Sequence, residues 1–584
     1  MSFLIYFRNN INYIQLSKMN TSVKKGLIIG GTSLIFGLAA LFWYLGMSNN
    51  NRLIAKIPKD AAMVFKADLK SLADKAEFKQ WKDLAMFEDM RKKESVLNQI
   101  LESPKKSGIN FMQNAYGFMS KGDDFYGGIV FGIKDAKDFE ETVKGIDSEI
   151  EVQKTDGLYT AEVDNNDIAL VWDKSVALMY FRDDEDVLDK AKQAFAQDED
   201  MSMLEMDTYM EFESLDADLG MYMNMKKFQE LASEMGGPMQ DQFKSMEKAE
   251  SIGMTILFED QQMLVDATYY PVEGATPEEI SMMKEESISA DLMKLISPTT
   301  PKGFYAANMD LDKILALYPQ INEEMMKDGF SLDEFKNSLN GEMTISLIDV
   351  KNVQKIREVA DYDNWEPNGF YDTPVPMKMD TTFELSPIYK INLGVKDRGI
   401  LDNIIAKFVA KMNEPVMSAE IFDMEDSMRS SFDSYTTPYD NLVEEIEEPK
   451  VKRYQYNGLE VFETEDAKLF YRYEGNYISI SNDESAFASQ NFSWDDELEE
   501  MLTEKVGAGY MDLNYKNYPE IERENSSDIQ KAKDFLLMFD NMKFSSDGMT
   551  FHFEMNFTDS PDHILWRMMK TIDAQVSGNR SNYN

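Results

Sequence analysis

The chain has 584 residues, 43% of them hydrophobic, which is enough for two to four folded domains. Its 60 lysines and arginines against 105 aspartates and glutamates give a net charge of −45, so nucleic acid is not expected as a partner. With no cysteine and only two histidines, disulfides, thiol nucleophiles, cysteine-containing zinc sites and His-rich metal sites are excluded, and no cofactor is expected.

The first predicted element is an uncharged apolar segment at residues 26–47, GLIIGGTSLIFGLAALFWYLGM. As a helix it would be about 33 Å long, which is enough to span a bilayer. Basic residues precede it, so the chain is expected to be an inner-membrane, single-pass protein with the N-terminus inside and a large periplasmic domain. The alternative is an export signal that is cleaved, although LGMSNNN lacks a small-residue cleavage pattern. Residues 1–25 are then a cytoplasmic tail or a gene-model extension, with Met19 as a second candidate start.

The first predicted module covers residues 52–275. MVFKADLKSL, ending at Leu72, reads as a strand that runs into a helix, and FGIKD at residues 131–135 opens an amphipathic helix. Asp156-Gly157 is a dipeptide typical of a tight hairpin, and the alternating residues after it predict antiparallel strands. Residues 276–297, with a Thr276 cap and early glutamates, predict a helical linker.

The second predicted module, residues 298–575, repeats these signals in the same order and indicates an internal duplication. Its strand-to-helix run ends at Ile314, LGVKD opens a helix with one apolar face, and Asn457-Gly458 marks the hairpin. Two later blocks also match: YMNM at 222–225 with YMDL at 510–513, and SIGMTILFE at 251–259 with SDGMTFHFE at 546–554. The sequence therefore predicts an α+β fold of two tandem related modules with mainly antiparallel sheets and amphipathic helices, followed by a disordered tail at 576–584.

The segment IPKDAAMVFKADLKSLADKA at residues 57–76 resembles the opening of a Bacteroidetes envelope family catalogued as domain of unknown function 4836. The resemblance extends from Ile57 to about Ile572. It implies export and a life at the surface or in the periplasm, but it brings no activity and no catalytic residues. Anchoring through a lipidated cysteine, which the family suggests, does not apply to a chain without cysteine.

The two histidines are candidate site residues. His552 alternates with Phe551 and Phe553 in TFHFEMNF, which predicts a solvated histidine on a strand, with no carboxylate placed near it. His563 follows Ser560 and Pro561, which predicts a surface residue in the first turns of a helix.

Other patterns that carry chemistry are interpreted as chance or as solvated surface. S-x-x-K occurs three times, at Ser103, Ser245 and Ser281, without the partner motifs of serine acyltransferases. Asp361, Asp363 and Glu366 offer oxygen ligands suited to calcium, but such clusters arise freely among 105 carboxylates, so a solvated loop is the favoured interpretation. Acidic runs such as Asp495 to Glu500 are typical of helix starts. No catalytic, cofactor-binding or metal-binding residue is therefore assigned.

These observations favour a membrane-tethered envelope protein that is non-enzymatic and binds an envelope protein or glycan, or acts as a scaffold. One alternative is a carboxylate-dependent glycan hydrolase, because that chemistry needs only two suitably spaced acids. Another is a soluble periplasmic binder released by signal cleavage. The acidity by itself is also consistent with adaptation to salt.

Overall fold

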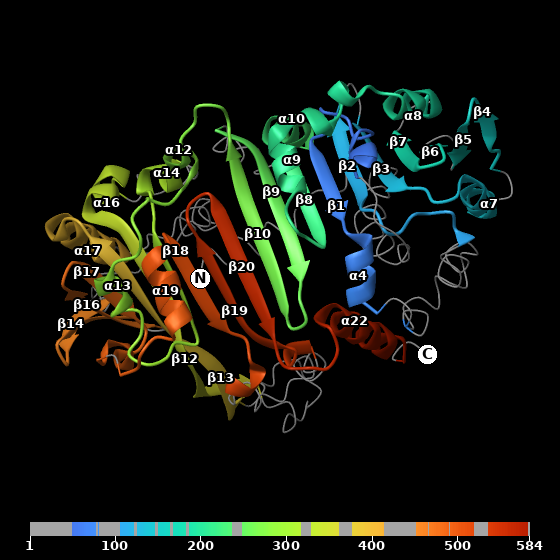
Figure 1. The fold of residues 1–584 in the computed structure, drawn as a ribbon. Coiled ribbons are helices and arrows are strands. Elements are labelled where there is room, and N and C mark those ends of the chain that lie inside the picture. Colours follow the sequence, from blue (N-terminus) through green and yellow to red (C-terminus); the bar gives the residue numbers. More distant parts are fainter. Residues whose placement is uncertain are drawn as a thin grey trace, which may run out of the picture. The chain divides into compact units, whose positions relative to one another are not determined.

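The structure is a computed structural model whose secondary structure combines helices with antiparallel strands, as an α+β fold requires (Figure 1). It describes residues 50–77, 80, 84, 106–121, 125–146, 150–163, 168–182, 186–235, 248–316, 329–360, 377–413, 451–464, 467–489, 491–518 and 535–581. The chain forms two compact units, Met1–Ser281 with Tyr510–Asn584, and Met282–Gly509. The end of the chain thus belongs to the same unit as its beginning.

The first unit contains an antiparallel sheet whose described strands follow the order β4-β5-β6-β7-β3-β2-β1-β8-β9-β10-β20-β19. The strands are β1 (Met63–Ala67), β2 (Ala115–Lys121), β3 (Phe125–Gly132), β4 (Gln153–Thr155), β5 (Leu158–Val163), β6 (Ile168–Trp172), β7 (Val176–Arg182), β8 (Leu219–Asn224), β9 (Ala249–Phe258), β10 (Gln262–Pro271), β19 (Phe539–Ser546) and β20 (Thr550–Phe557). The C-terminal hairpin β19–β20 joins this sheet through β10, with Asp266 opposite His552.

Helices pack on this sheet because their sequences carry one apolar face. The helices of the unit are α3 (Asn51–Ile54), α4 (Leu69–Lys75), α7 (Ala136–Ile146), α8 (Val187–Phe195), α9 (Asp207–Glu213), α10 (Met225–Met235), α12 (Pro277–Ile280) and α22 (Ile564–Ser581). Asp68 caps α4, because its carboxylate accepts a hydrogen bond from the Ser71 N–H at 2.8 Å. Phe139 and Val143 of α7 are buried in the core, as the spacing after FGIKD predicts.

The second unit contains a smaller antiparallel arrangement with the order β11-β12-β13-β17-β16-β15-β14 among its described strands. The strands are β11 (Gly303–Asn308), β12 (Leu339–Ala360), β13 (Met377–Val395), β14 (Lys452–Tyr456), β15 (Leu459–Glu463), β16 (Lys468–Glu474) and β17 (Tyr477–Ser481). The helices are α13 (Ala290–Met293), α14 (Leu311–Ala316), α16 (Leu332–Ser338), α17 (Arg398–Met412) and α19 (Asp496–Glu504). The strand β18 (Gly507–Asp512) spans the boundary between the units.

The two predicted hairpin turns are confirmed. Asp156 and Gly157 have φ of 51° and 87°, and Asn457 and Gly458 have φ of 52° and 77°. Both dipeptides therefore adopt the left-handed backbone that a two-residue hairpin turn requires. They join β4 to β5 and β14 to β15.

Three sequence expectations need correction. The apolar face of α17 was expected to be buried, but Phe408 is 54% exposed and Met412 is 43% exposed, because the core cluster that holds Leu401 covers only the first turns of the helix. The matched blocks SIGMTILFE and SDGMTFHFE do not fall on corresponding strands, since the first lies on β9 whereas the second spans the end of β19, a turn and β20. The expected tail at 576–584 begins inside α22, which continues to Ser581.

Several predictions concern parts of the chain that are not described. The predicted anchor at 26–47, the tail at 1–25 and the candidate calcium ligands Asp361, Asp363 and Glu366 all lie outside the described residues. In the described ranges, no helix combines the length and apolarity needed to cross a bilayer. The predicted linker at 276–297 contains the two four-residue helices α12 and α13.

Candidate functional site

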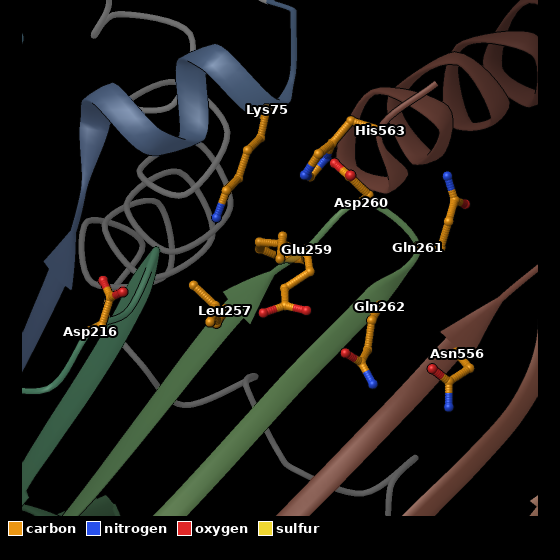
Figure 2. Close-up of a pocket in the computed structure, with 10 residues that line it drawn as sticks. Lys75, Asp216, Leu257, Glu259, Asp260, Gln261, Gln262, Asn556 and His563 are labelled. Atoms are coloured by element: carbon orange, nitrogen blue, oxygen red, sulfur yellow. The ribbon is translucent and has the colours of Figure 1, made fainter. Parts of the chain in front are cut away.

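A cleft of about 720 Å³ opens in the first unit at the turn between β9 and β10 (Figure 2). Side chains from one helix, three strands and the segments next to them converge there. They are Lys75, Asp216, Leu257, Phe258, Glu259, Asp260, Gln261, Gln262, Asn556 and His563. Most of these side chains are polar, so the cleft is suited to a ligand that forms hydrogen bonds.

One wall of the cleft is the β9–β10 turn, which is fastened to the start of α22. The Gln261 side-chain amide donates to the backbone carbonyls of Ser560 at 2.7 Å and Asp562 at 3.3 Å. The N–H of Ile564 donates to the carbonyl of Asp260 at 3.0 Å. These contacts hold the turn against a helix that is distant in sequence, so the wall is preorganised.

Lys75, a lining residue at the end of α4, forms an ion pair with the buried Asp218, just before β8. The Lys75 Nζ lies 2.8 Å from Oδ1 and 2.6 Å from Oδ2 of Asp218. The Asp218 side chain is 1% exposed and that of Lys75 is 22% exposed. The N–H of Phe258 also donates to Asp218 Oδ2, at 2.6 Å. Asp218 therefore positions the ammonium of Lys75 at the cleft and anchors the end of β9.

His563 contributes a neutral imidazole at the mouth of the cleft. Burial and the nearby Lys75 lower the pKa of His563 below its usual value of 6.5, against the opposing effects of Asp260 and Asp218. Its Nδ1 accepts a hydrogen bond from the Leu565 N–H at 3.2 Å, so the side chain caps the first turn of α22. Figure 2 shows His563 and Asp260 side by side at this end of the cleft.

The charge of the lining favours a ligand with cationic or hydrogen-bond-donating groups. Asp216, Glu259 and Asp260 are exposed carboxylates, whereas the positive charge of Lys75 is neutralised by Asp218. Gln262 and Asn556, which face each other across β10 and β20, add amide donors and acceptors. In the described part of the chain, no group of three or more His, Asp or Glu side chains has the geometry to hold a metal ion.

The structure places the two histidines differently from the expectation for each. His552 is 41% exposed, but its Nδ1 lies 2.6 Å from Oδ1 of Asp266 on β10, so a carboxylate does lie beside it. His563 lines the cleft instead of a plain helix surface. The sequence could not show either contact, because each depends on pairing between segments nearly 300 residues apart.

Of the remaining candidate motifs, those within the described residues do not line this cleft. Ser103 and Ser245 lie outside the described residues, and Ser281–Lys284 is not helical. Asp495 caps α19 through the Glu497 N–H at 3.0 Å, which confirms that this acidic run marks a helix start. Lys75 lies within the segment 57–76 that carries the family resemblance, but neither Lys75 nor Asp218 was singled out as a candidate site residue.

A second buried polar cluster surrounds Glu213 at the end of α9. The Tyr116 hydroxyl donates to Glu213 Oε1 at 2.7 Å, and the Lys66 Nζ lies 3.7 Å from Oε2. Lys66 also donates to the carbonyls of Glu213 at 2.8 Å and Leu215 at 3.1 Å, so it caps the helix. Burial raises the pKa of Glu213, although Lys66 and Tyr116 oppose that effect.

We expect the free energy of unfolding of Glu213→Gln, relative to that of the native protein, to increase as the pH rises. A carboxyl group with a raised folded-state pKa contributes stability below its unfolded pKa and loses it as the pH passes through the folded pKa. Glutamine keeps the acceptor for Tyr116 but cannot ionise. Urea unfolding at pH 4 and pH 8 measures this, with the difference between variant and native protein expected to shift in favour of the variant at pH 8. A difference that shifts the other way would show that the ionised carboxylate stabilises Lys66.

Comparison with known proteins gives one family match. A family model described as "Domain of unknown function (DUF4836)" matches residues 54–372, which is more than half of the chain. No curated protein matches the chain. Among solved structures, crystal form III of TP0453 is similar over 38% of this chain and 81% of its own, with 8% identity and a TM-score of 0.25. Crystal form IV of TP0453 is similar over 37% of this chain and 79% of its own, with 8% identity and a TM-score of 0.24.

Proposed function

The chain belongs to the DUF4836 family, and on that premise we propose that it is a membrane-tethered binding or scaffold protein of the bacterial cell envelope. Its role is to hold an envelope component, a protein segment or a glycan, at the folded part of the chain. The cleft at the β9–β10 turn is the ligand site.

The observation that carries this proposal is the construction of the cleft. Its wall is fastened to the first residue of α22 and to the segment just before it by three hydrogen bonds, and its lining residue Lys75 forms two hydrogen bonds to the buried Asp218. A rigid site lowers the entropy lost on binding, because few groups have to be ordered by the ligand. Exposed carboxylates and amides at the rim then select a partner with complementary donors.

The strand pairings support the proposed internal duplication. In the first unit β1 pairs with β2, β2 with β3, and β3 with β7; in the second unit β11 pairs with β12, β12 with β13, and β13 with β17. The hairpins β4–β5–β6–β7 and β14–β15–β16–β17 also correspond. The same order of pairing in both units is expected if one module gave rise to both.

The tether is proposed from residues 26–47, which contain no charged side chain. We expect full-length protein with a C-terminal epitope to fractionate with membranes and to be digested by added protease in spheroplasts but not in intact cells. Digestion in intact cells would place the folded part at the outer surface. Soluble, shortened protein would instead show that the segment is a cleaved export signal.

The cleft is tested by reversing charge at its rim. In full-length protein solubilised from membranes, the double variant Glu259→Lys/Asp260→Lys should lose the envelope components that co-purify with the native protein. Its melting temperature should stay unchanged, because both side chains are exposed. The matched control is Asp200→Lys/Glu273→Lys, which reverses two exposed acids outside the cleft. Equal recovery of partners by both double variants would remove the cleft from the binding function.

A further inference from the structure

A carboxylate, an imidazole and a hydroxyl lie in one row across three neighbouring strands of the first unit. The strands β10, β20 and β19 lie side by side (Figure 1). Asp266 on β10 is directly opposite His552 on β20, and His552 is directly opposite Ser545 on β19. Directly opposite residues of antiparallel strands point to the same face, with Cβ atoms about 4.5–5.5 Å apart. The three side chains therefore share one face of the sheet, with the imidazole in the middle.

The contact between Asp266 and His552 fixes the orientation of the ring. The Asp266 Oδ1 lies 2.6 Å from His552 Nδ1, and an ionised carboxylate can only accept, so Nδ1 carries the proton. The neutral ring then presents the lone pair of Nε2, the arrangement of a general base. Because β20 lies between β10 and β19, Ser545 is the neighbour of His552 on the side away from Asp266.

The exposure of the imidazole and the surroundings of the Ser545 hydroxyl are consistent with His552 acting as a general base. The side chains of Asp266 and His552 are 43% and 41% exposed, so a reactant can reach the imidazole. Ser545 is 8% exposed, and its hydroxyl forms no hydrogen bond to another residue in the part of the chain that the structure describes. Lys543 lies two residues before Ser545 on β19 and on the same face, and its Nζ is 3.6 Å from Oε1 of Glu554.

The row is also continuous with the cleft. Asn556, which lines the cleft, lies on β20 on the same face as His552. Four residues of strand separate them, a distance of about 13 Å at the usual rise. A ligand held at the cleft can thus extend along the strands to the row.

We propose that Ser545, His552 and Asp266 form a nucleophile, base and positioning carboxylate that cleave a carboxylic ester, an activity beyond the binding function proposed above. The order acid–imidazole–hydroxyl is that of the Ser-His-Asp triad, which is recognised by geometry and not by sequence position. In structures without substrate, the nucleophile–base hydrogen bond is often long and tightens only when substrate binds.

The chemical steps balance without a cofactor. The Oγ of Ser545 bonds to the acyl carbon while the bond to the alcohol oxygen breaks, and the hydroxyl proton passes through His552 Nε2 to the departing alcohol. Water, losing a proton to the same nitrogen, then attacks the acyl carbon. The bond to Oγ breaks, the proton returns to Ser545, and a carboxylic acid is released. The ammonium of Lys543 stabilises the developing oxyanion.

The test uses full-length protein in detergent and a fluorophosphonate probe, whose phosphorus bonds to an activated serine with loss of fluoride. We expect one adduct, mapped to Ser545 by peptide mass spectrometry, and protein-dependent hydrolysis of p-nitrophenyl acetate. Ser545→Ala should abolish the adduct, and His552→Gln or Asp266→Asn should slow ester hydrolysis at least about 100-fold.

The matched control is Ser546→Ala. Its hydroxyl lies on the opposite face and accepts the Gly548 N–H at 3.0 Å, so labelling and hydrolysis should stay native. Melting curves of the variants separate lost reactivity from lost folding. Absence of an adduct on the folded native protein, an adduct on another serine, or undiminished hydrolysis by Ser545→Ala would each overturn the proposal, and none of them bears on binding at the cleft.

Discussion

Replacing Glu474 by leucine is expected to lower the free energy of unfolding by about 3–5 kcal/mol, because it leaves a buried ammonium without its carboxylate. Lys390 on β13 has a side chain that is 4% exposed, and its Nζ lies 3.5 Å from Oε2 of Glu474 at the end of β16. Burial already lowers the pKa of Lys390, and Glu474 is the main opposing influence. Without Glu474, folding would require the lysine to be desolvated or to lose its proton.

Replacing the other partner of the pair, Lys390, is expected to lower the free energy of unfolding only slightly. Glu474 also accepts from the Arg472 Nε at 3.0 Å and from the Ser479 hydroxyl at 2.6 Å, so Lys390→Met leaves the carboxylate with two partners. We expect a loss of less than about 1 kcal/mol for Lys390→Met. The double variant Lys390→Met/Glu474→Leu should recover most of the loss caused by Glu474→Leu, because the buried ammonium is then gone. Arg472 also loses Glu474, but its side chain is 38% exposed and still donates to the Phe487 carbonyl at 2.9 Å.

Hydrogen exchange of β13 and β17 measures these effects locally, which matters in a chain with two units. The matched control is Glu334→Leu, which removes the partner of Lys407 in a pair whose side chains are 41% and 45% exposed. That exposed pair should contribute less than about 1 kcal/mol. The role assigned to burial would be contradicted if Glu474→Leu and Glu334→Leu lost the same free energy of unfolding. It would also be contradicted if the double variant lost more than the two single variants, Lys390→Met and Glu474→Leu, lose together.

The two units share an order of strand pairing but differ in which residue types their paired strands bury. At the positions of β12, β13 and β17 whose pairings correspond to β2, β3 and β7, the second unit buries polar residues where the first is apolar or aromatic. The second unit has Thr344, Ser346, Lys390, Asn392, Ser479 and Ser481, and the first has Tyr116, Phe118, Gly128, Val130, Leu178 and Tyr180. The polar face is satisfied by the segment after α13, since Asn392 donates to the Leu295 carbonyl at 3.0 Å and Ser346 to that of Ile296 at 2.6 Å.

The sequence predicts the features that depend on local signals, but it does not predict which polar residues become buried. The hairpins at Asp156-Gly157 and Asn457-Gly458 were predictable, because their turn chemistry is local. The helix starts after FGIKD and LGVKD were predictable from spacing for the same reason. Ser and Asn are more often exposed than buried, and only the pairing of distant strands shows that Asn392 of β13 and Ser479 and Ser481 of β17 are buried.

The cleft was hidden from the sequence for a related reason. Lys75 and Asp218 are 143 residues apart, and the paired residues Asp266 of β10 and His552 of β20 are 286 residues apart. Neither lysine nor aspartate is unusual among 60 basic and 105 acidic residues, so composition gives no signal. Pairing between strands decides which of these many charges becomes buried and which remains solvated.

Asp218→Ala is expected to cost about 3–5 kcal/mol of folding free energy and to release the Lys75 ammonium at the cleft. The substitution strands two donors at once, the Lys75 ammonium and the Phe258 N–H, where water has little access. Lys75→Met should be similarly costly, because it leaves the 1% exposed carboxylate with a single backbone donor. Asp218→Asn should fall between these variants and the native protein, since its amide oxygen keeps one acceptor.

A matched control for Asp218→Ala lies on α4, the helix that carries Lys75. Lys70 and Asp74 of α4 form an ion pair with side chains that are 53% and 49% exposed, so Asp74→Ala should cost less than about 1 kcal/mol. Urea unfolding gives the free energies, and recovery of envelope partners reports on the cleft. If Asp218 positions Lys75 for binding, Asp218→Asn should weaken recovery at temperatures where it remains folded, whereas Asp74→Ala should not. Native recovery by folded Asp218→Asn would restrict the ion pair to a structural role, because binding would then be independent of where the ammonium is held.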